Sequence, residues 1–532
     1  MRTILHNGKI FVEKGIFVEA ILIEDGLVKS IGPNDNILAL QADTITDLEG
    51  KTVIPGINDS HLHLTMVGEA MNACNLINAK SIEDIIAIGK KFLIDHPDTR
   101  TMIGRGWNQD YFTSGEKRLL TRHDLDKIST EIPIVFDRVC IHVSSGNTKA
   151  VEMTGIDSTT RVDGGKIELS DDGIPTGVFK ENAVQIIRSV IPKKTKSDIK
   201  KDFLKAMEYA ISVGLTSVQS CDTMDKNYPT VFEALQELAD EKKLKFRYRM
   251  QYNFQDIEDF KIYLQTENIN GRYDEKFYSK GCLKLFKDGS LGARTALLKE
   301  EYNDDSGNFG VEGLSDDKLQ ALCDLAVENN TQVITHAIGD KAVDSVINAY
   351  ENGMKNSKNP LRHGIVHNQI TSLEQLKKIA KLQIPVMYQP IFLNYDYKII
   401  VDRIGEERAK TSYALNTLYK LGALVSLSTD APVEDCNPFE NIYCAVNRKG
   451  LAGRPVNSYQ SEECMVIEDA IDAYTRLSAY NEFKEDTKGK LQPGFVADLI
   501  VLDRDIFTIP SMDIKNVQVE TTMVNGKIVY HQ

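Results

Sequence analysis

The pattern of hydrophobic and polar residues divides the chain into regions that predict different secondary structure. Short β-rich runs occupy residues 9–12 and 16–24 near the N-terminus, and residues 497–503 and 521–530 near the C-terminus. Asp25-Gly26 follows the second run, and this dipeptide between two β-rich runs predicts a hairpin. Because both ends carry short β-rich runs and the middle of the chain has a different pattern, we expect the two ends to form one small sheet domain.

From about residue 200 onward, short apolar strands alternate with amphipathic helices. Ser315 is predicted to cap a helix that has apolar residues at positions i, i+3, i+4 and i+7. A second helix is expected to end at Asn352-Gly353, and Thr371 with Glu374 forms a candidate capping box for a third. Strands alternating with helices predict parallel βα units, and their continuation favours a closed barrel over an open sheet.

These patterns together predict an α/β fold, a (β/α)8 TIM-like barrel with two additions. Residues 1–55 and 485–532 are expected to form a composite β-sandwich domain, and residues 56–484 the barrel. The first barrel strand is placed between Thr52 and His63. The stretch of about 65–195 lacks the regular alternation of strands and helices, and we predict that it is an inserted subdomain.

Composition and charge narrow the classes of function. The 532 residues are 42% hydrophobic and 26% charged, as in ordinary globular proteins. A formal net charge of −14 argues against a nucleic-acid partner. The N-terminus breaks to polar residues before a signal-peptide core can form, and no apolar run approaches the roughly 20 residues of a membrane helix. The 8 cysteines are scattered without a C-x-x-C pair, which fits free thiols in a reducing compartment.

From these features we expect a cytoplasmic protein that acts on a small-molecule substrate and has no membrane partner. The sequence leaves open whether the chain forms a homo-oligomer.

The first motif with chemical content is formed by His61 and His63. Residues two apart on a β-strand point to the same face, so both imidazoles can reach one metal ion. Two histidines at this spacing also occur by chance, and the motif alone is weak. Its position at the end of an apolar strand, shortly after Pro55-Gly56, strengthens it.

Four further candidates lie in or just after predicted strands: Lys284, His336, His367 and Asp430. The C-terminal ends of barrel strands converge on the face where active sites lie. Taken singly, each candidate has a structural alternative, such as a hydrogen-bonded histidine or a lysine that neutralises a buried carboxylate. Suitable residues on several strands together favour a shared site.

Six stretches of the chain, spread almost from end to end, resemble one family. They are residues 55–63, 173–177, 284–292, 336–340, 428–433 and 491–499. On these stretches the chain resembles the amidohydrolase superfamily, and within it the amidohydrolase-3 branch of YtcJ-like metal-dependent hydrolases. The stretch 284–292 and the tripeptide Asp430-Ala431-Pro432 are specific to this branch, whereas the others are shared widely across the superfamily.

The resemblance implies a metal centre with either one or two ions. His61 and His63 would bind the more buried ion, and His336 and His367 would bind at a second position. Lys284 would bridge two ions as a carbamate. Imidazole and carboxylate ligands favour zinc, with manganese or iron as alternatives.

The resemblance also implies how the chemistry proceeds. Asp430 would bind metal and act as the general base. The metal would lower the pKa of its water from about 15.7 toward about 7, and it can also polarise a carbonyl. Asp430 would take a proton as the water attacks, and would then deliver it to the leaving nitrogen.

Four residues are candidates for contacts with the substrate. His142 resembles a histidine that the family carries in the insertion, and a structural role explains it equally well. Trp107 is a candidate wall of the substrate pocket, although a packing anchor under the insertion explains it at least as well. Arg294 and Gln389 complete the set. Cys140-Ile141 replaces the Asp-Gly type of sequence that the family often has there, which leaves substrate specificity open.

The expected activity is hydrolysis of a C–N bond in a non-peptide amide, a formamide or a cyclic amide. An esterase, a lactonase or a deaminase is the alternative among enzymes, because the same activated water attacks all of these centres. A catalytically silent homologue with a binding or regulatory role is the alternative outside enzymes. The presence of Asp430, His61 and His63 argues against that last alternative.

Overall fold

The structure is a computed structural model. It describes residues 1–109, 112–138, 143–162, 165–181, 183–223, 228–266, 273–354 and 358–532. The chain forms two compact units, residues 1–64 with 203–532 and residues 65–202. Within the described ranges, no helix is both long and apolar enough to cross a membrane. The seven cysteines in those ranges are free thiols.

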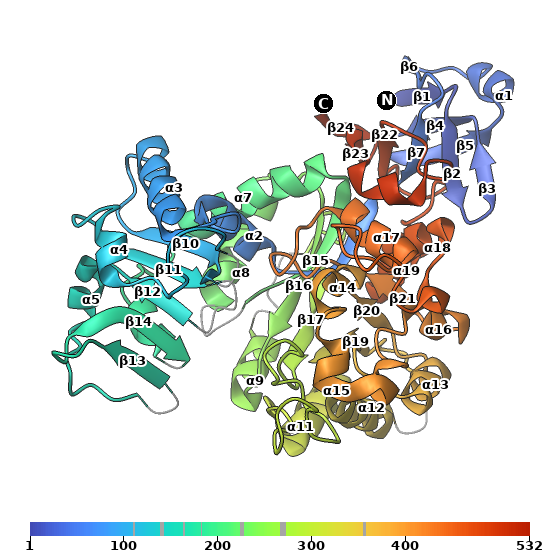
Figure 1. The fold of residues 1–532 in the computed structure, drawn as a ribbon. Coiled ribbons are helices and arrows are strands. Elements are labelled where there is room, and N and C mark those ends of the chain that lie inside the picture. Colours follow the sequence, from blue (N-terminus) through green and yellow to red (C-terminus); the bar gives the residue numbers. More distant parts are fainter. Residues whose placement is uncertain are drawn as a thin grey trace. The chain divides into compact units, whose positions relative to one another are not determined.

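A barrel of eight parallel strands forms the centre of the first unit (Figure 1). In spatial order the strands are β8 (Ile57–Leu62), β15 (Leu215–Thr223), β16 (Arg247–Asn253), β17 (Tyr278–Phe286), β18 (Val333–Ala337), β19 (Gly364–His367), β20 (Val386–Tyr388) and β21 (Val425–Leu427). Each strand pairs in parallel with the next. The predicted (β/α)8 barrel is confirmed.

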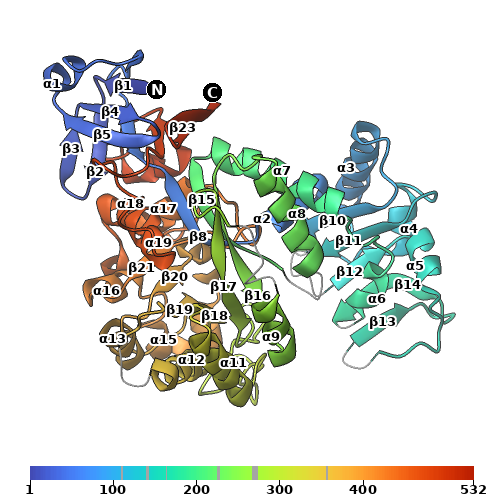
Figure 2. The same ribbon diagram turned by 180° about the vertical axis from the view of Figure 1, so that it is seen from behind.

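Helices alternate with these strands along the chain, and Figure 2 shows α11, α12 and α13 outside the barrel strands. The helices are α7 (Lys196–Ser212), α8 (Tyr228–Asp240), α9 (Ile257–Gln265), α11 (Asp316–Glu328), α12 (Asp340–Met354), α13 (Leu373–Leu382), α14 (Leu393–Asp396), α15 (Ile400–Ala409), α16 (Leu415–Lys420), α17 (Pro438–Asn447), α18 (Ile467–Tyr474) and α19 (Arg476–Asn481). Ser315 caps α11 as predicted, because its side chain accepts a hydrogen bond from the backbone N–H of Lys318.

Two of the predicted helix boundaries differ from the observed ones by one residue each. The capping box of α13 is formed by Ser372 and Gln375, because the hydroxyl of Thr371 donates to the carbonyl of Thr411 instead. Helix α12 continues through Asn352-Gly353 to its end at Met354. A contact between residues distant in the sequence therefore decides the first of these boundaries over local propensity.

Backbone hydrogen bonds close the barrel between its first and last strands. The N–H of Asp430 donates to the carbonyl of His61 at 3.0 Å, and the N–H of His63 donates to that of Ala431 at 2.8 Å. These bonds hold the segment after β21 against the end of β8. The closure of the barrel thus brings the candidate ligands of both segments together.

Both termini contribute to the sheets next to the barrel, so the predicted β domain is confirmed. One sheet has the order β24-β23-β22-β7-β2-β3, and the other has the order β5-β4-β1-β6. Their strands are β1 (Arg2–His6), β2 (Lys9–Glu13), β3 (Ile16–Val18), β4 (Ala20–Glu24), β5 (Leu27–Gly32), β6 (Thr44–Asp47), β7 (Thr52–Pro55), β22 (Leu499–Leu502), β23 (Val519–Val524) and β24 (Lys527–His531), with the short helix α1 (Asn34–Leu38).

One predicted β-rich run is divided, and the first barrel strand lies between Thr52 and His63 as predicted, preceded there by a strand of the β domain. Residues 16–24 form β3 and β4, which lie in different sheets, and the stretch from Thr52 to His63 forms β7 and β8. Gly56 lies between β7 and β8, where a Cβ would lie 2.2 Å from Oγ1 of Thr216. Only glycine allows the backbone to pass this close from the β domain into the barrel. The hairpin at Asp25-Gly26 is confirmed, since β4 and β5 pair antiparallel across it.

The second unit is built on a sheet of the order β13-β14-β12-β11-β10-β9. Its strands are β9 (Cys74–Asn75), β10 (Met102–Trp107), β11 (Ile134–Arg138), β12 (Val143–Gly146), β13 (Gly165–Leu169) and β14 (Pro175–Glu181), and its helices include α3 (Ile82–Asp95), α4 (Arg122–Asp126), α5 (Thr148–Thr154) and α6 (Val184–Arg188). Helix α2 (Leu64–Asn72) begins at the boundary between the units.

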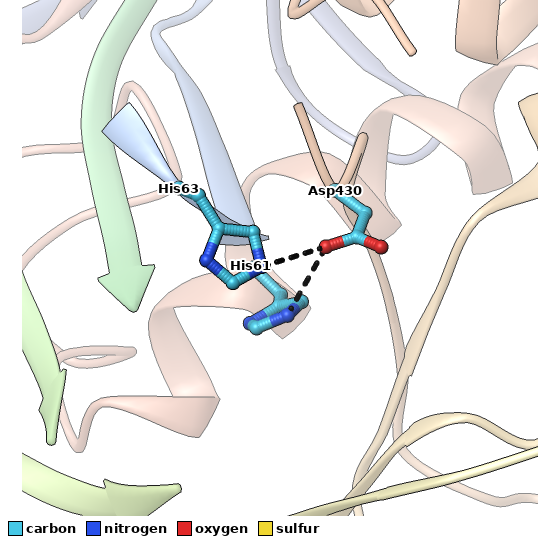
Figure 3. Close-up of side chains that lie close together, drawn as sticks. All are labelled: His61, His63 and Asp430. Carbon is cyan, nitrogen blue, oxygen red and sulfur yellow. Dashed lines mark ion pairs between the residues drawn. The ribbon is translucent and has the colours of Figure 1, made fainter. Parts of the chain in front are cut away.

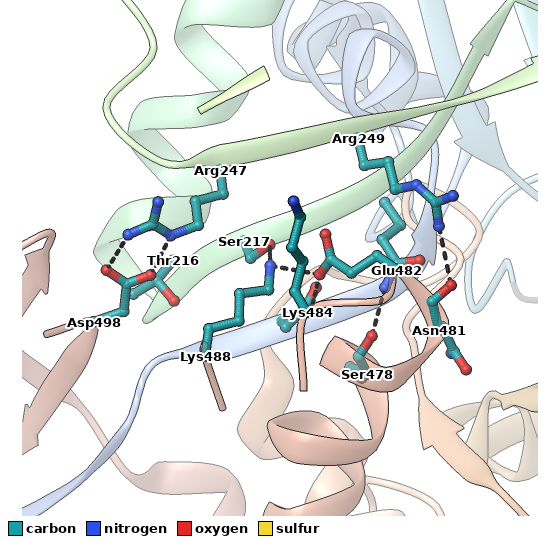
Figure 4. A network of polar contacts seen from close by, with 12 residues as sticks. Thr216, Ser217, Arg247, Arg249, Ser478, Asn481, Glu482, Lys484, Lys488 and Asp498 are labelled. Atoms are coloured by element: carbon teal, nitrogen blue, oxygen red, sulfur yellow. Dashed lines mark hydrogen bonds and ion pairs between the residues drawn. The ribbon is translucent and has the colours of Figure 1, made fainter. Parts of the chain in front are cut away.

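A buried polar network lies at the N-terminal ends of the barrel strands (Figure 4). Arg247 donates to both carboxylate oxygens of Asp498, at 2.6 and 2.9 Å. Lys488 forms an ion pair with Glu482 and donates to Oγ of Ser217 at 2.6 Å. These contacts join the first strands of the barrel to the segment that leads into the C-terminal strands of the β domain.

Candidate metal centre

Three predicted ligands converge where the barrel closes (Figure 3). Nε2 of His61 lies 3.3 Å from Oδ1 of Asp430, and Nε2 of His63 lies 3.2 Å from the same oxygen. All three residues are buried, and their ligand atoms lie within 4.8 Å of one another. The alternation of side chains along β8 puts both imidazoles on one face, as the sequence predicted.

This arrangement fits a metal ion. Nε2 of His61 and Oδ1 of Asp430 are buried without a hydrogen-bond partner, which leaves both atoms available to bind a ligand. A tetrahedron with ligand distances of about 2.0–2.1 Å has edges of about 3.3–3.4 Å. The observed separations of 3.2 and 3.3 Å are close to such an edge.

The protonation states of three of the four histidines also suit a metal centre, whereas at His63 the contact with Asp430 outweighs burial and raises the pKa to about 10. Burial, together with the nearby charge of Lys284, lowers the pKa of His61 to about 4 and that of His336 to about 3. Burial lowers the pKa of His367 as well. Neutral imidazole is the form that binds metal. Although burial opposes it, the neighbouring imidazoles of His61 and His63 hold the pKa of Asp430 well below its ordinary value.

The other two predicted histidines lie beside this group. The ring centroids of His336 and His367 are 4.4 Å apart, and the ring of His367 is 6.2 Å from that of His61. His336 comes from β18 and His367 ends β19, so neighbouring strands present the two rings at the same end of the barrel. The structure therefore brings all four histidines to one place.

Lys284 is buried near the end of β17 and has an unusual environment. Its Nζ has no hydrogen-bond partner and lies 3.8 Å from the ring centroid of Phe286. Burial lowers the pKa of this amine below its ordinary value. A buried lysine without a carboxylate partner does not match the structural alternative of a neutralising ion pair.

Two carboxylates that we had not singled out support the ligands. Asp59 accepts hydrogen bonds from the backbone N–H of His61 at 3.1 Å and from the hydroxyl of Thr429 at 2.6 Å, and so links the two ligand segments. Oδ1 of Asp288 lies 3.4 Å from Nε2 of His336. Burial raises the pKa of each carboxyl to about 7. Both residues lie in stretches that resemble the family, but their types alone did not reveal these contacts.

Two of the residues predicted to contact the substrate are held by contacts within the protein. Trp107 lies fully buried in the hydrophobic core of the second unit, with its indole N–H directed at the carbonyl of Phe136 at 3.4 Å. This is the packing role that we weighed against a pocket wall. Arg294 is held by two hydrogen bonds to Asp304. His142 lies outside the described residues. The role of each in substrate binding stays a prediction.

Gln389 is bound to its neighbours through its whole amide group. Its Nε2 donates to the carbonyl of Met387 at 3.0 Å and to Oγ of Ser428 at 2.7 Å, and its Oε1 lies 2.8 Å from Nδ1 of His367. Both amide hydrogens are used. This geometry favours a role in holding His367 over the predicted contact with a substrate.

Comparison with known proteins places these features in context. A sequence profile described as "Amidohydrolase family" matches residues 44–530. The YtcJ protein of Bacillus subtilis (strain 168) is 33% identical over 100% of both chains. An uncharacterized metal-dependent hydrolase from Pyrococcus horikoshii OT3 has a similar structure, with a TM-score of 0.81 and 30% identity over 96% of this chain and 99% of that one. An N-substituted formamide deformylase from Arthrobacter pascens is 22% identical over 97% of this chain and 95% of its own length.

Proposed function

Because the chain belongs to the amidohydrolase family, we propose that it hydrolyses a C–N bond in a non-peptide amide, a formamide or a cyclic amide. The observation that carries the proposal is the buried trio of His61, His63 and Asp430, with its unpartnered nitrogen and oxygen. The similarity to a formamide deformylase supports the choice of bond.

The trio would hold one divalent ion, and zinc suits its two imidazoles and one carboxylate best. His336 and His367 would serve a second position, with Lys284 as a carbamate between the two. A divalent ion bound there would supply an activated water at neutral pH and would polarise the substrate carbonyl.

Asp430 is the residue that moves the proton. Its carboxylate is buried among the imidazoles, and its low pKa keeps it ionised at neutral pH before the reaction. It accepts a proton as water adds to the carbonyl carbon and returns that proton to the departing nitrogen. Asp59 accepts hydrogen bonds from the hydroxyl of Thr429 and the backbone N–H of His61, and these keep the carboxylate of Asp430 in position beside the ligands.

A substrate screen tests the proposal. Purified, metal-loaded protein is assayed against formamides, cyclic amides, linear amides, esters and lactones, with the Asp430→Asn variant as the matched control. We expect turnover of at least one class of amide that the variant loses. Turnover of esters or lactones alone would overturn the C–N assignment. Turnover of nothing by the metal-loaded protein would favour the catalytically silent homologue.

A further inference from the structure

Each of the four histidines at the candidate metal centre has one ring nitrogen facing an oxygen acceptor, which leaves the other nitrogen for a ligand. Nδ1 of His63 lies 2.6 Å from the carbonyl of Cys221, and Nε2 of His336 lies 2.9 Å from that of Gly289. These two acceptors belong to the backbone. The acceptors for His61 and His367 are instead the side chains of two glutamines.

Gln251, on β16, faces His61. Its Oε1 lies 2.5 Å from Nδ1 of His61, while its Nε2 donates to the carbonyl of Ser60 at 3.0 Å. Because a carbonyl oxygen only accepts, the amide nitrogen must face Ser60 and the amide oxygen must face the ring. Nδ1 of His61 therefore carries the proton, and Nε2 presents its lone pair toward Asp430.

Gln389 holds His367 in the same way from the end of β20. Its Nε2 donates to the carbonyl of Met387, which fixes the amide orientation, and its Oε1 faces Nδ1 of His367. Gln251 is 0% exposed and Gln389 is 2% exposed, so water does not replace them readily. Each one therefore sets the tautomer and the orientation of one ring.

We propose that Gln251 and Gln389 are positioning residues for the metal centre, the first through His61 and the second through His367. This inference rests on the metal site of the proposed function. An amide is neutral, so it orients the ring without adding negative charge to a site that already contains Asp430. Because the two glutamines act on different histidines, they should act on different metal positions.

Zinc titration of the full-length, metal-stripped chain against a chromophoric chelator tests this inference. Gln251→Met and Gln389→Met keep the approximate size of the side chain and remove the acceptor. Gln219→Met is the matched control, because Gln219 is 1% exposed on the barrel strand β15 and donates to the carbonyl of Ser478 rather than facing a histidine. We expect each of the first two variants to weaken one zinc-binding event by about 10–100-fold. The double variant should weaken both events.

Three results have distinct meanings. If both variants bind zinc as Gln219→Met does, the positioning role is wrong. If each variant weakens both binding events equally, the effect is a general disturbance of the barrel, and the assignment to separate positions is wrong. If the unmodified chain binds no divalent ion, the metal site of the proposed function fails and this inference fails with it.

Discussion

The two ends of the barrel bury polar side chains in different ways. At the C-terminal ends of the strands, Nε2 of His61, Nζ of Lys284 and Oδ1 of Asp430 have no hydrogen-bond partner. At the N-terminal ends, Arg247 forms a two-point ion pair with Asp498 (Figure 4). Burial alone therefore does not distinguish the two clusters, but the pairing of charged side chains does. Arg247 and Lys488 are each paired with a carboxylate, whereas Nζ of Lys284 is not, and the unpartnered atoms of the N-terminal cluster include the neutral amide oxygens of Asn58 and Asn481.

The difference separates stability from ligand binding. A buried polar cluster whose charged members pair with one another needs no ligand and joins elements of the fold. A cluster whose ionisable groups lack partners makes the folded state less stable until a ligand completes it. The position of each cluster agrees, since active sites of such barrels lie at the C-terminal face and the opposite face serves stability.

Removing the proton acceptor at the C-terminal end should produce the largest effect. Asp430→Asn keeps the shape of the side chain but removes the basic carboxylate, so kcat should fall by about 10²–10⁴-fold. The thermal unfolding midpoint should change little. Steady-state kinetics on a substrate that the parent chain hydrolyses, together with a melting curve, measures both. Normal turnover by the variant would show that Asp430 is not the base.

Disrupting the polar network at the N-terminal ends of the strands should lower the stability of the fold and leave the metal site intact. Arg247→Met leaves the carboxylate of Asp498 buried without its partner, which should destabilise the chain by about 3–5 kcal/mol. Metal content should be unchanged. Adding Asp498→Leu to the variant should recover part of the loss, because no unpaired charge then remains. An unchanged melting curve for Arg247→Met would contradict the stabilising role.

Lys284 should carry a carbamate. The unprotonated form of its amine would bond to the carbon of carbon dioxide and release one proton, and the product would supply two oxygen ligands. Burial without a partner and the lowered pKa favour this reaction. Carbon-13 bicarbonate should label the chain, and the carbonyl signal should disappear in Lys284→Met. An active, metal-loaded chain without that signal would show that the lysine is unmodified.

The smallest expected effect concerns Glu434, which follows Asp430 in the loop. Burial, with the charges of Glu440, Asp396 and Asp435, raises its pKa to about 8 from an ordinary 4.5. The stability from this bound proton is present below pH 4.5 and is lost as the pH rises through about 8.

Glu434→Gln should therefore gain stability over the parent chain as the pH rises, on the order of 1 kcal/mol per pH unit at most. Melting curves at pH 5 and pH 8 compare the two. The same pH dependence in both chains would show that ionisation of Glu434 does not destabilise the fold.

The sequence predicted the features that depend on periodicity and on residue type. The barrel followed from alternating strands and helices, and the convergence of His61, His63 and Asp430 followed from their positions at strand ends. The division of residues 52–63 at Gly56 could not be predicted, because it depends on Thr216, which is distant in the sequence.

The supporting residues were missed for a related reason. Gln251 is an ordinary glutamine in a strand, and only the pairing of β16 with its neighbours brings it to His61. The same holds for Arg247, whose partner is Asp498, and for the contact of Lys488 with Ser217, because both contacts join residues that lie far apart along the chain. Long-range contacts between single polar residues leave no periodic signal.

The central claim is that the incomplete cluster at the C-terminal ends is a metal site. Elemental analysis of protein purified without added metal tests it most directly, with His63→Asn and Arg247→Met measured alongside. The account predicts about one or two divalent ions per chain in the parent and in Arg247→Met, and a loss of metal in His63→Asn. A parent chain that contains no metal and keeps full activity after chelation would contradict it.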